Sequence, residues 1–399
     1  MNTVETIYLQ LLRYAIIGES SKDLTFSLSS QEWKEFVQLN YRQGTSGLVF
    51  NEVLARKDDV PDDLRQEMRG MCAMQMMKQP RLQDLLRTTF NTLQQAGLRP
   101  VLLKGFGLAE LYPRPELRSW GDLDVYVGPD QYHEAAGVLR KAFPDSLHHE
   151  EEWEELKHYN FVLPDGLVEM HRVSVKMEHP RDKKIYYALE CEAMQPDRVE
   201  HLALREPDML IDIPESRFNM LFTFLHAWNH FVEEGLGMKQ LCDVYLLARK
   251  TYESERKKTH NDYETYMRRN LNALRLMQPW QLIGYVLVEY MQLPSEMWLG
   301  YWGKDNRWLR RHGELFFRRV MDEGILRDEA AEKLKTRYTD RDRDRRMPLY
   351  LRKLKTLRLR IASSRWLRDY SEEYARHKLA TAVYRGIGRL FKKDEAVMY

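Results

Sequence analysis

The sequence predicts an α+β protein in which a small mixed β-sheet is embedded between N-terminal and C-terminal α-helices. Helical periodicity dominates residues 3–97 and returns after Glu215, whereas residues 100–175 consist of short apolar or alternating segments. Apolar residues make up 43% of the 399 residues and charged residues 31%, a balance that builds a folded core. The aromatic content of 11% excludes a disordered chain.

Three helices are expected in the N-terminal region. Apolar side chains recur at helical spacing over residues 9–16, and Ser30 is a suitable N-cap for the second helix. The third helix begins near Asp62 and carries a stripe of methionines, which we interpret as core. Pro80 should bend or split this helix, and Gly97 stands where a C-terminal cap is needed.

The middle of the chain alternates strands with short helices. The Asp165-Gly166 dipeptide between two alternating segments predicts a β-hairpin. The expected strands cover residues 100–104, 122–127, 159–163 and 167–173, and the expected helices cover 106–112 and 129–143.

Helices follow from residue 215 onward, over about 215–233, 237–250 and 257–292 and again beyond 305. We therefore divide the chain into four parts. They are an N-terminal helical region (1–97), an α/β core (98–212), a helical domain lining the cleft (213–338) and a basic helical C-terminal segment (339–399).

The net charge of +2 hides an uneven distribution. Residues 331–399 carry 20 Lys and Arg against 9 Asp and Glu, a balance of +11, so that the preceding residues carry −9. Such a segment is expected to meet an anionic partner: a phosphate, a nucleic acid, a lipid surface or the acidic body itself. We favour packing on the body, because an apolar stripe continues into Trp366 and Tyr370. The stripe consists of Leu349, Leu351, Leu354, Leu357 and Ile361.

The composition also indicates the cellular compartment of the protein. No segment reaches the roughly eighteen uncharged apolar residues of a membrane-spanning helix, and the N-terminus lacks the basic start of a signal peptide. The three cysteines, Cys72, Cys191 and Cys242, are far apart, which excludes a disulfide scaffold and a cysteine-based zinc site. We expect a soluble cytoplasmic protein without a transmembrane segment.

Acidic residues in the α/β core form a pattern with chemical meaning. Asp122 and Asp124 lie two residues apart on a strand, so both carboxylates project from one face. Adjacent carboxylates repel each other unless a cation joins them, and Mg²⁺ prefers such oxygen ligands. The alternative is an exposed edge strand with solvated aspartates.

A third acidic residue supports the interpretation that Asp122 and Asp124 bind a metal ion. Glu169 points to the opposite face from Val168 and Met170 on the downstream hairpin strand. If this strand pairs beside that of Asp122, a three-carboxylate cluster forms that is able to hold two metal ions for phosphoryl transfer. Upstream, Lys104-Gly105 lies between a strand and a helix, where glycine lets the backbone approach a phosphate.

The segment LLKGFGLAELYPRPELRSWGDLDVYV resembles the core of the nucleotidyltransferase superfamily, which has the polymerase β-like fold. More narrowly, the chain is similar to the uncharacterised nucleotidyltransferase family over residues 95–250. The resemblance implies transfer of a nucleoside monophosphate from an NTP such as ATP to an acceptor, with release of pyrophosphate. It also implies Mg²⁺, or Mn²⁺, held by Asp122, Asp124 and Glu169. One departure is Lys104-Gly105 in place of the usual Gly-Ser, so that lysine or backbone amides must hold the triphosphate.

Further candidates surround this motif. Arg118 could clamp a phosphate through two hydrogen bonds, although a surface arginine is an equal alternative. Lys239 and Asp243 are further candidates for binding the nucleotide. They lie on the helix expected over residues 237–250.

Three histidines are candidates for the acceptor site. His171 follows the third acid and could orient it or line this site, or else be a histidine of the core or surface. His226 and His230 have the i, i+4 spacing of a zinc pair, but a third ligand is missing, so we favour helix packing or the substrate cleft.

A small-molecule acceptor, such as a sugar or sugar phosphate, is favoured over a nucleic acid, because the basic segment lacks aromatic residues interleaved on a sheet or groove. Two alternatives remain. One is a catalytically silent nucleotide-binding regulator or antitoxin-like module. The other is a nucleotidyltransferase that modifies nucleic acid.

Overall fold

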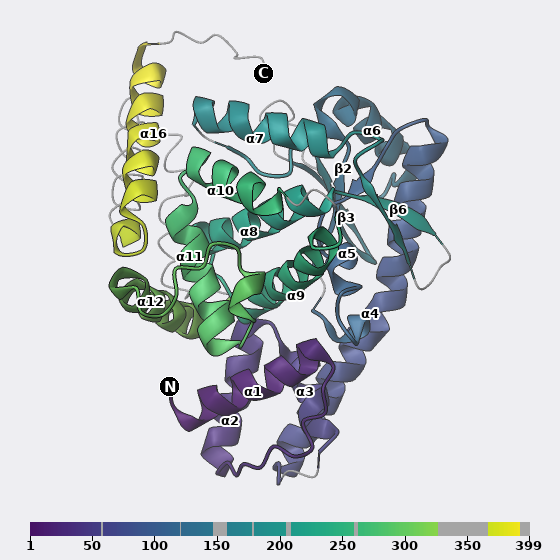
Figure 1. Cartoon of the computed structure of the whole chain (residues 1–399). Helices are drawn as coiled ribbons and strands as arrows, with labels where there is room; N and C mark the ends of the chain where they lie inside the picture. The colour runs from purple at the N-terminus through teal and green to yellow at the C-terminus, as the bar shows by residue number, and fades with distance from the viewer. Residues whose placement is uncertain are drawn as a thin grey trace.

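The structure is a computed structural model of the chain (Figure 1). It describes residues 1–56, 59–119, 121–146, 158–177, 179–204, 209–258, 262–325 and 366–391, without the side chains of 382–391. The predicted α+β class is confirmed, because helices surround one four-stranded and one two-stranded sheet. The apolar stripe of the basic segment, residues 349–361, lies outside the described residues.

Four helices form the N-terminal part: α1 (Thr3–Ile17), α2 (Ser30–Gln43), α3 (Ser46–Leu54) and α4 (Asp62–Gln95). The N-cap of α2 is Ser29, one residue before the predicted Ser30. Its side chain accepts a hydrogen bond from the Glu32 amide, and the Glu32 carboxylate accepts one from the Ser29 amide in return. Gly97 follows α4 with a left-handed φ of 79°, as its predicted capping role requires.

Of the two outcomes predicted for Pro80, a bend or a split of the third helix, the split is wrong. The α4 helix continues through Pro80 over 34 residues and runs from the N-terminal helices up to the sheet (Figure 1). Proline removes one intrahelical hydrogen bond, a cost of about 3 kcal/mol. Packing on both sides of the proline outweighs this cost, because Leu64 and Met68 are buried in the N-terminal core and Leu86 and Phe90 against the sheet.

The main sheet has the strand order β1-β2-β4-β3, formed by β1 (Val101–Leu102), β2 (Leu123–Tyr126), β4 (Gly166–His171) and β3 (His158–Leu163). Strands β2 and β4 are parallel, and the other two pairs are antiparallel. The predicted hairpin is therefore present as β3 and β4. Two helices stand near their predicted positions: α5 (Phe106–Ala109) and α6 (Gly128–Ala142).

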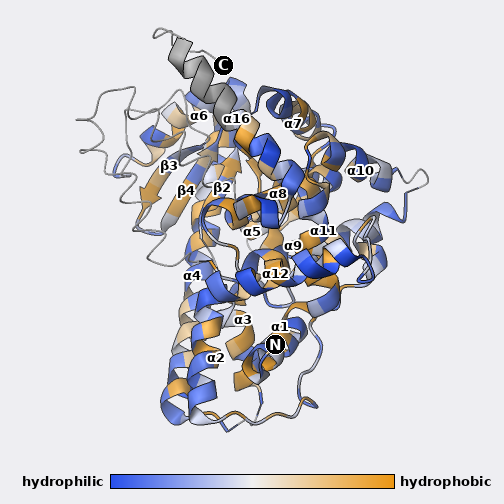
Figure 2. Cartoon of the chain, turned by 90° about the vertical axis from the view of Figure 1, so that its left-hand side faces the viewer, coloured by the Kyte–Doolittle hydropathy of each residue, from blue (hydrophilic) through white to orange (hydrophobic). Residues whose placement is uncertain are grey.

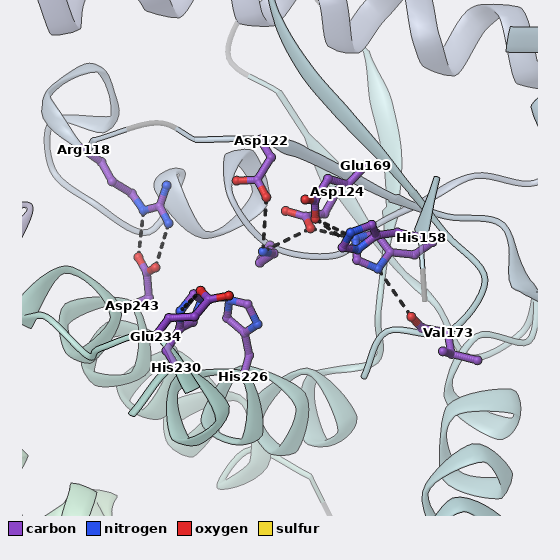
Figure 3. A network of polar contacts seen from close by, with 12 residues as sticks. Arg118, Asp122, Asp124, His158, Glu169, Val173, His226, His230, Glu234 and Asp243 are labelled. Carbon is purple, nitrogen blue, oxygen red and sulfur yellow. Dashed lines mark hydrogen bonds and ion pairs between the residues drawn. The ribbon is translucent and has the colours of Figure 1, made fainter. Parts of the chain in front are cut away.

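The two faces of this sheet differ in polarity. Leu123 and Val125 of β2 lie in one buried cluster with Val168 and Met170 of β4 and with apolar side chains of α4 and α6. Because side chains alternate along a strand, the residues between them face the other way, toward α8 (Ser216–Glu233) and α9 (Met238–Glu255). The polar site is built on this second face (Figure 3).

The segment between β4 and α8 has elements that periodicity did not predict. It contains α7 (Pro180–Ala193) and the antiparallel strands β5 (Glu200–Ala203) and β6 (Leu210–Ile213). These strands are four residues each, too short for the alternation to stand out.

The predicted helix over 257–292 is divided in two. It consists of α10 (Tyr263–Ala273) and α11 (Met277–Tyr285), and α11 continues into a π-helical turn, Val286–Tyr290. Arg275 between them has a left-handed φ of 59°, which ends the first helix. Further along lie α12 (Arg307–Glu323) and α16 (Glu372–Phe391), and short 3₁₀ turns cover Pro115–Leu117, Ser295–Met297 and Leu367–Asp369.

The start of the C-terminal segment packs on the helical core. The rings of Trp366 and Tyr370 lie 5.6 and 5.0 Å from that of Phe231 in α8, and the Arg319 guanidinium lies 4.1 Å from the Trp366 ring. In Figure 2 the helices α7 and α10 are largely hydrophilic. Within the described ranges, every helix is too short or too polar to cross a membrane.

Candidate active site

Three carboxylates meet on the polar face of the sheet (Figure 3). Asp124 in β2 stands directly opposite Glu169 in β4, and Asp122 precedes Asp124 by two residues. Their ligand oxygens lie within 4.8 Å of one another. The side chain of Asp124 is 1% exposed and that of Asp122 is 31% exposed. The predicted pairing of the two strands is thus present and brings the three acids together.

Lys104 lies against this cluster. The Leu103 amide donates a hydrogen bond to the Asp124 carbonyl, which extends the pairing of β1 with β2 and sets the lysine beside the acids. Its Nζ is 3.1 Å from Asp124 Oδ1 and 3.6 Å from Asp122 Oδ2. Burial alone would lower the pKa of the Lys104 ammonium, but the neighbouring carboxylates, Asp124 foremost, raise it above its ordinary value. Lys104 is therefore a permanent cation within the cluster.

The backbone conformation at position 105 requires glycine. Its φ of 64° is left-handed, and a Cβ atom there would lie 3.3 Å from the Asp122 carbonyl oxygen. The glycine thus allows Lys104 and the acidic strand to approach closely. The α5 helix that follows has four residues and so contributes little helix dipole.

Two histidines complete the cluster. His171 is buried, and its Nε2 lies 2.8 Å from Asp124 Oδ1 and 3.5 Å from Glu169 Oε2. It orients the acids and is not open to an acceptor. His158 Nδ1 lies 3.4 Å from Glu169 Oε2. Sequence reasoning missed His158, although its position opposite His171 on the hairpin, at an even spacing from Asn160, could have indicated the shared face.

The protonation of Glu169 is shifted by these surroundings. Burial raises the pKa of its carboxyl group, and the charges of Asp124 and Asp122 add to this effect, while a hydrogen bond from His171 opposes it. A carboxylate with a raised pKa is a better proton acceptor. Glu169 therefore has the oxygen donors of a metal ligand, and in this arrangement its carboxyl group holds a proton more readily than a free glutamate.

Arg118 and Asp243, which we expected to bind nucleotide, bind each other. Arg118 Nε and Nη2 lie 2.8 and 2.7 Å from the two oxygens of Asp243, and Tyr112 donates a further hydrogen bond of 2.8 Å to the same carboxylate. All three side chains are buried. The pair fastens the loop before β2 to α9.

Lys239, one turn before Asp243 on α9, is half-buried. Burial, and then the Arg118 charge, lowers the pKa of its ammonium to about 8, although Asp243 and Asp122 act in the opposite direction. Its ammonium group makes no hydrogen bond or ion pair with the residues that the structure describes. The Lys239 ammonium lies close enough to Asp122 to interact with its charge, and it remains available to a ligand.

The model of a protein family described as "Uncharacterised nucleotidyltransferase" matches residues 29–291, which is more than half of the chain. The chain belongs to the uncharacterised nucleotidyltransferase family. No curated protein and no solved structure matches it. The family match contains all three carboxylates, Lys104 and α9, whereas α12 and α16 lie beyond its end. Membership assigns the general activity of nucleotidyl transfer.

The carboxylates of this nucleotidyltransferase fit a divalent metal ion. Asp122, Asp124 and Glu169 offer oxygen atoms within 4.8 Å of one another, and oxygen donors are the ligands that Mg²⁺ prefers. The net negative charge of the three acids exceeds the single charge of Lys104, so a further cation would be stabilised there.

His226 and His230 of the nucleotidyltransferase lie on α8 and face Asp122 in Figure 3. Their Nε2 atoms are 3.0 Å apart, and His230 Nδ1 is 3.1 Å from Glu234 Oε2. Both line a cavity of about 350 Å³, together with Val175 after β4 and Tyr374 of α16. None of the three carboxylates lines this cavity, and the role of these histidines in helix packing or in a substrate cleft stays a prediction.

Proposed function

We propose that this protein transfers a nucleoside monophosphate from an NTP to a hydroxyl or phosphate oxygen of a small molecule, with the help of Mg²⁺ or Mn²⁺. The observation that carries the proposal is the cluster of Asp122, Asp124 and Glu169 on adjacent parallel strands. The three carboxylates together carry more negative charge than the single ammonium of Lys104 neutralises, so a further cation would stabilise the cluster.

In the proposed reaction, the acceptor oxygen forms a bond to the α-phosphorus, and the bond to the bridging oxygen of the β-phosphate breaks, so that pyrophosphate leaves. Asp122, Asp124 and Glu169 would hold the metal ion. When bound, the ion stabilises the negative charge that develops on the phosphate oxygens. Glu169 would also accept the proton of an acceptor hydroxyl.

The triphosphate would lie against two lysines. Lys104, with Gly105 allowing its close approach, supplies a cation next to the acids, and Lys239 supplies one from α9. Phosphate oxygens pair well with ammonium groups. The Lys104-Gly105 sequence would thus replace the hydroxyl of the usual Gly-Ser.

The size of the cavity favours a small acceptor. Its volume of about 350 Å³ is within the range of small-molecule sites. His226, His230 and His179 offer hydrogen bonds to hydroxyl or phosphate oxygens there. A sugar or sugar phosphate has the matching chemistry, and a cytoplasmic metabolite agrees with the location expected from the cysteine content.

The test is to incubate the protein with each α-labelled NTP, Mg²⁺ and a metabolite extract, and to identify the labelled product by mass spectrometry. A labelled small molecule with equimolar pyrophosphate supports the proposal. Label in RNA would support the nucleic-acid alternative. Binding of NTP without any product would support the silent regulator.

Lys104→Met keeps the length of the side chain and removes its charge. We expect the affinity for NTP at limiting Mg²⁺ to fall by about 10-fold or more, since a charge-assisted contact contributes roughly 1.5–3 kcal/mol. Isothermal titration calorimetry measures the change, and Lys104→Arg is the matched control because it keeps the charge. Equal affinities for Lys104→Met and wild type would mean that the lysine does not contact the triphosphate.

Affinity for NTP should also depend on pH through Lys239. The pKa of about 8 means that the free protein loses this ammonium as the pH rises through 8, and a contact with phosphate is lost with it. We expect binding to weaken between pH 7 and 9 in the wild type, but not in Lys239→Met, which should bind weakly throughout. Parallel pH profiles for the two proteins would contradict the assignment.

A further inference from the structure

We propose that His179, Asp182 and His377 form a second metal site, which takes Zn²⁺ and joins α16 to α7. The three side chains offer ligand atoms within 4.8 Å of one another. They are separate from the three carboxylates on the main sheet, and the inference does not depend on the proposed function.

The three donors come from two helices that are far apart in the sequence. His179 is the N-cap of α7, and Asp182 follows it by three residues in the first turn. His377 lies on α16, 195 residues after Asp182, and its Nε2 is in hydrogen-bond contact with Asp182 Oδ2. The ring centroids of His179 and His377 are 4.5 Å apart. The fold therefore brings two imidazoles to one buried carboxylate.

The types of donor indicate which ion the site would take. Imidazole nitrogen is a good ligand for Zn²⁺, whereas Mg²⁺ prefers oxygen ligands alone. Zinc bound by two histidines and a carboxylate commonly keeps a fourth position for water or a small ligand. His179, Asp182 and His377 all line the cavity of about 350 Å³, which leaves room for this fourth ligand.

Only a small movement is needed to close the site around an ion. His179 Nδ1 lies 4.0 Å from Asp182 Oδ1, and ligands at about 2.0–2.2 Å from one tetrahedral zinc ion lie about 3.4 Å apart. The same nitrogen accepts a hydrogen bond of 3.3 Å from the Arg181 amide, so it carries the lone pair that a metal ligand must have. Arg181 is exposed, and its amide can bond to water when the ring rotates.

Arg275 holds the carboxylate of this site in place. Its Nη1 lies 3.2 Å from Asp182 Oδ1, as an outer partner does that orients a metal ligand. The positive charge of Arg275 offsets part of the negative charge of Asp182. Attraction by charge alone is therefore weak, and the two imidazole nitrogens decide which ion binds.

The site would connect two parts of the chain. His179 and Asp182 lie within residues 29–291, which the family model matches, and His377 lies beyond them. Tyr374, Lys378 and Thr381 of α16 also line the cavity. A zinc ion would thus hold α16 in place as one wall of this cavity.

The experiment titrates ZnCl₂ into the full-length protein, which is stripped of metal with EDTA, carries no histidine tag and is kept in excess Mg²⁺. Calorimetry gives the affinity, and X-ray absorption at the zinc edge identifies imidazole ligands. We expect His377→Ala to weaken zinc binding at least about 100-fold, because even the loss of a side chain that only orients a ligand costs roughly 10–100-fold. His230→Ala is the matched control. It removes a histidine of the same cavity outside the cluster and should bind zinc like wild type.

Hydrogen exchange measures whether zinc joins the two helices. At a zinc concentration of about 100 times the Kd, openings that break the site become up to about 100-fold rarer. Exchange of the amides of residues 372–381 should therefore slow with zinc in wild type and in His230→Ala, but not in His377→Ala.

Equal zinc affinity in wild type and His377→Ala would overturn the inference, as would zinc binding that is lost only in Asp122→Asn, because the ion would then bind the carboxylates of the sheet. Zinc binding at His377 without slower exchange in α16 would overturn the joining of the helices. Urea unfolding separates loss of binding from loss of fold, and His377→Gln, which keeps a hydrogen-bond donor for Asp182, serves where His377→Ala does not fold. The assay with labelled NTP tests nucleotidyl transfer independently of these outcomes.

Discussion

Asp122→Asn combined with Asp124→Asn should reduce nucleotidyl transfer by at least about 10³-fold and abolish Mg²⁺-dependent binding of NTP. The double change removes two of the three carboxylates that would hold the metal ion. The loss of several kcal/mol of charge stabilisation in the transition state corresponds to this factor. Rapid-quench assays with the identified acceptor measure transfer, and titration calorimetry measures binding.

The single variants distinguish a loss of catalytic activity from a loss of folding stability. Asp122 is 31% exposed, so Asp122→Asn should lose activity with little change in urea stability. Asp124 is buried and paired with Lys104 and His171. Repulsion between the acids suggests that removing both Asp122 and Asp124 raises the stability or leaves it level. The structure instead predicts that removing Asp124 costs about 3 kcal/mol, because a buried ammonium loses its closest partner. Wild-type transfer by Asp122→Asn would place the metal elsewhere.

Asp243→Ala should destabilise the protein by about 3–5 kcal/mol, the largest stability effect that we expect from one substitution. It leaves the buried Arg118 guanidinium without its carboxylate, and Tyr112 loses its acceptor too. Urea unfolding followed by circular dichroism measures the change.

The double variant Arg118→Met with Asp243→Leu provides the control. It removes both charges and keeps apolar volume, so much of the stability should return. If Arg118 instead served a bound phosphate with no structural role, Asp243→Ala would leave stability near wild type, and Arg118→Met alone would lower NTP affinity. The structure predicts the reverse order, since Nε and Nη2 of the guanidinium both donate to Asp243.

The local sequence determined the strands of the site and the direction of their side chains. The alternation in β2 and β4 places Asp122, Asp124 and Glu169 on one face, because the period of a strand is two residues whatever packs against it. The Asp165-Gly166 turn likewise fixed the hairpin. The boundaries of the four predicted domains, in contrast, stay a prediction.

Contacts between distant segments were decided by the tertiary structure. The helix through Pro80 persists because its two halves are buried by different parts of the chain, so local propensity was overruled. Arg118 has the same sequence context whether it binds a phosphate or Asp243, which follows 125 residues later. His158 joins the site through its pairing with His171 across the hairpin. A side chain's partner depends on which charges the fold brings within a few ångströms, and the sequence near that residue does not carry this information.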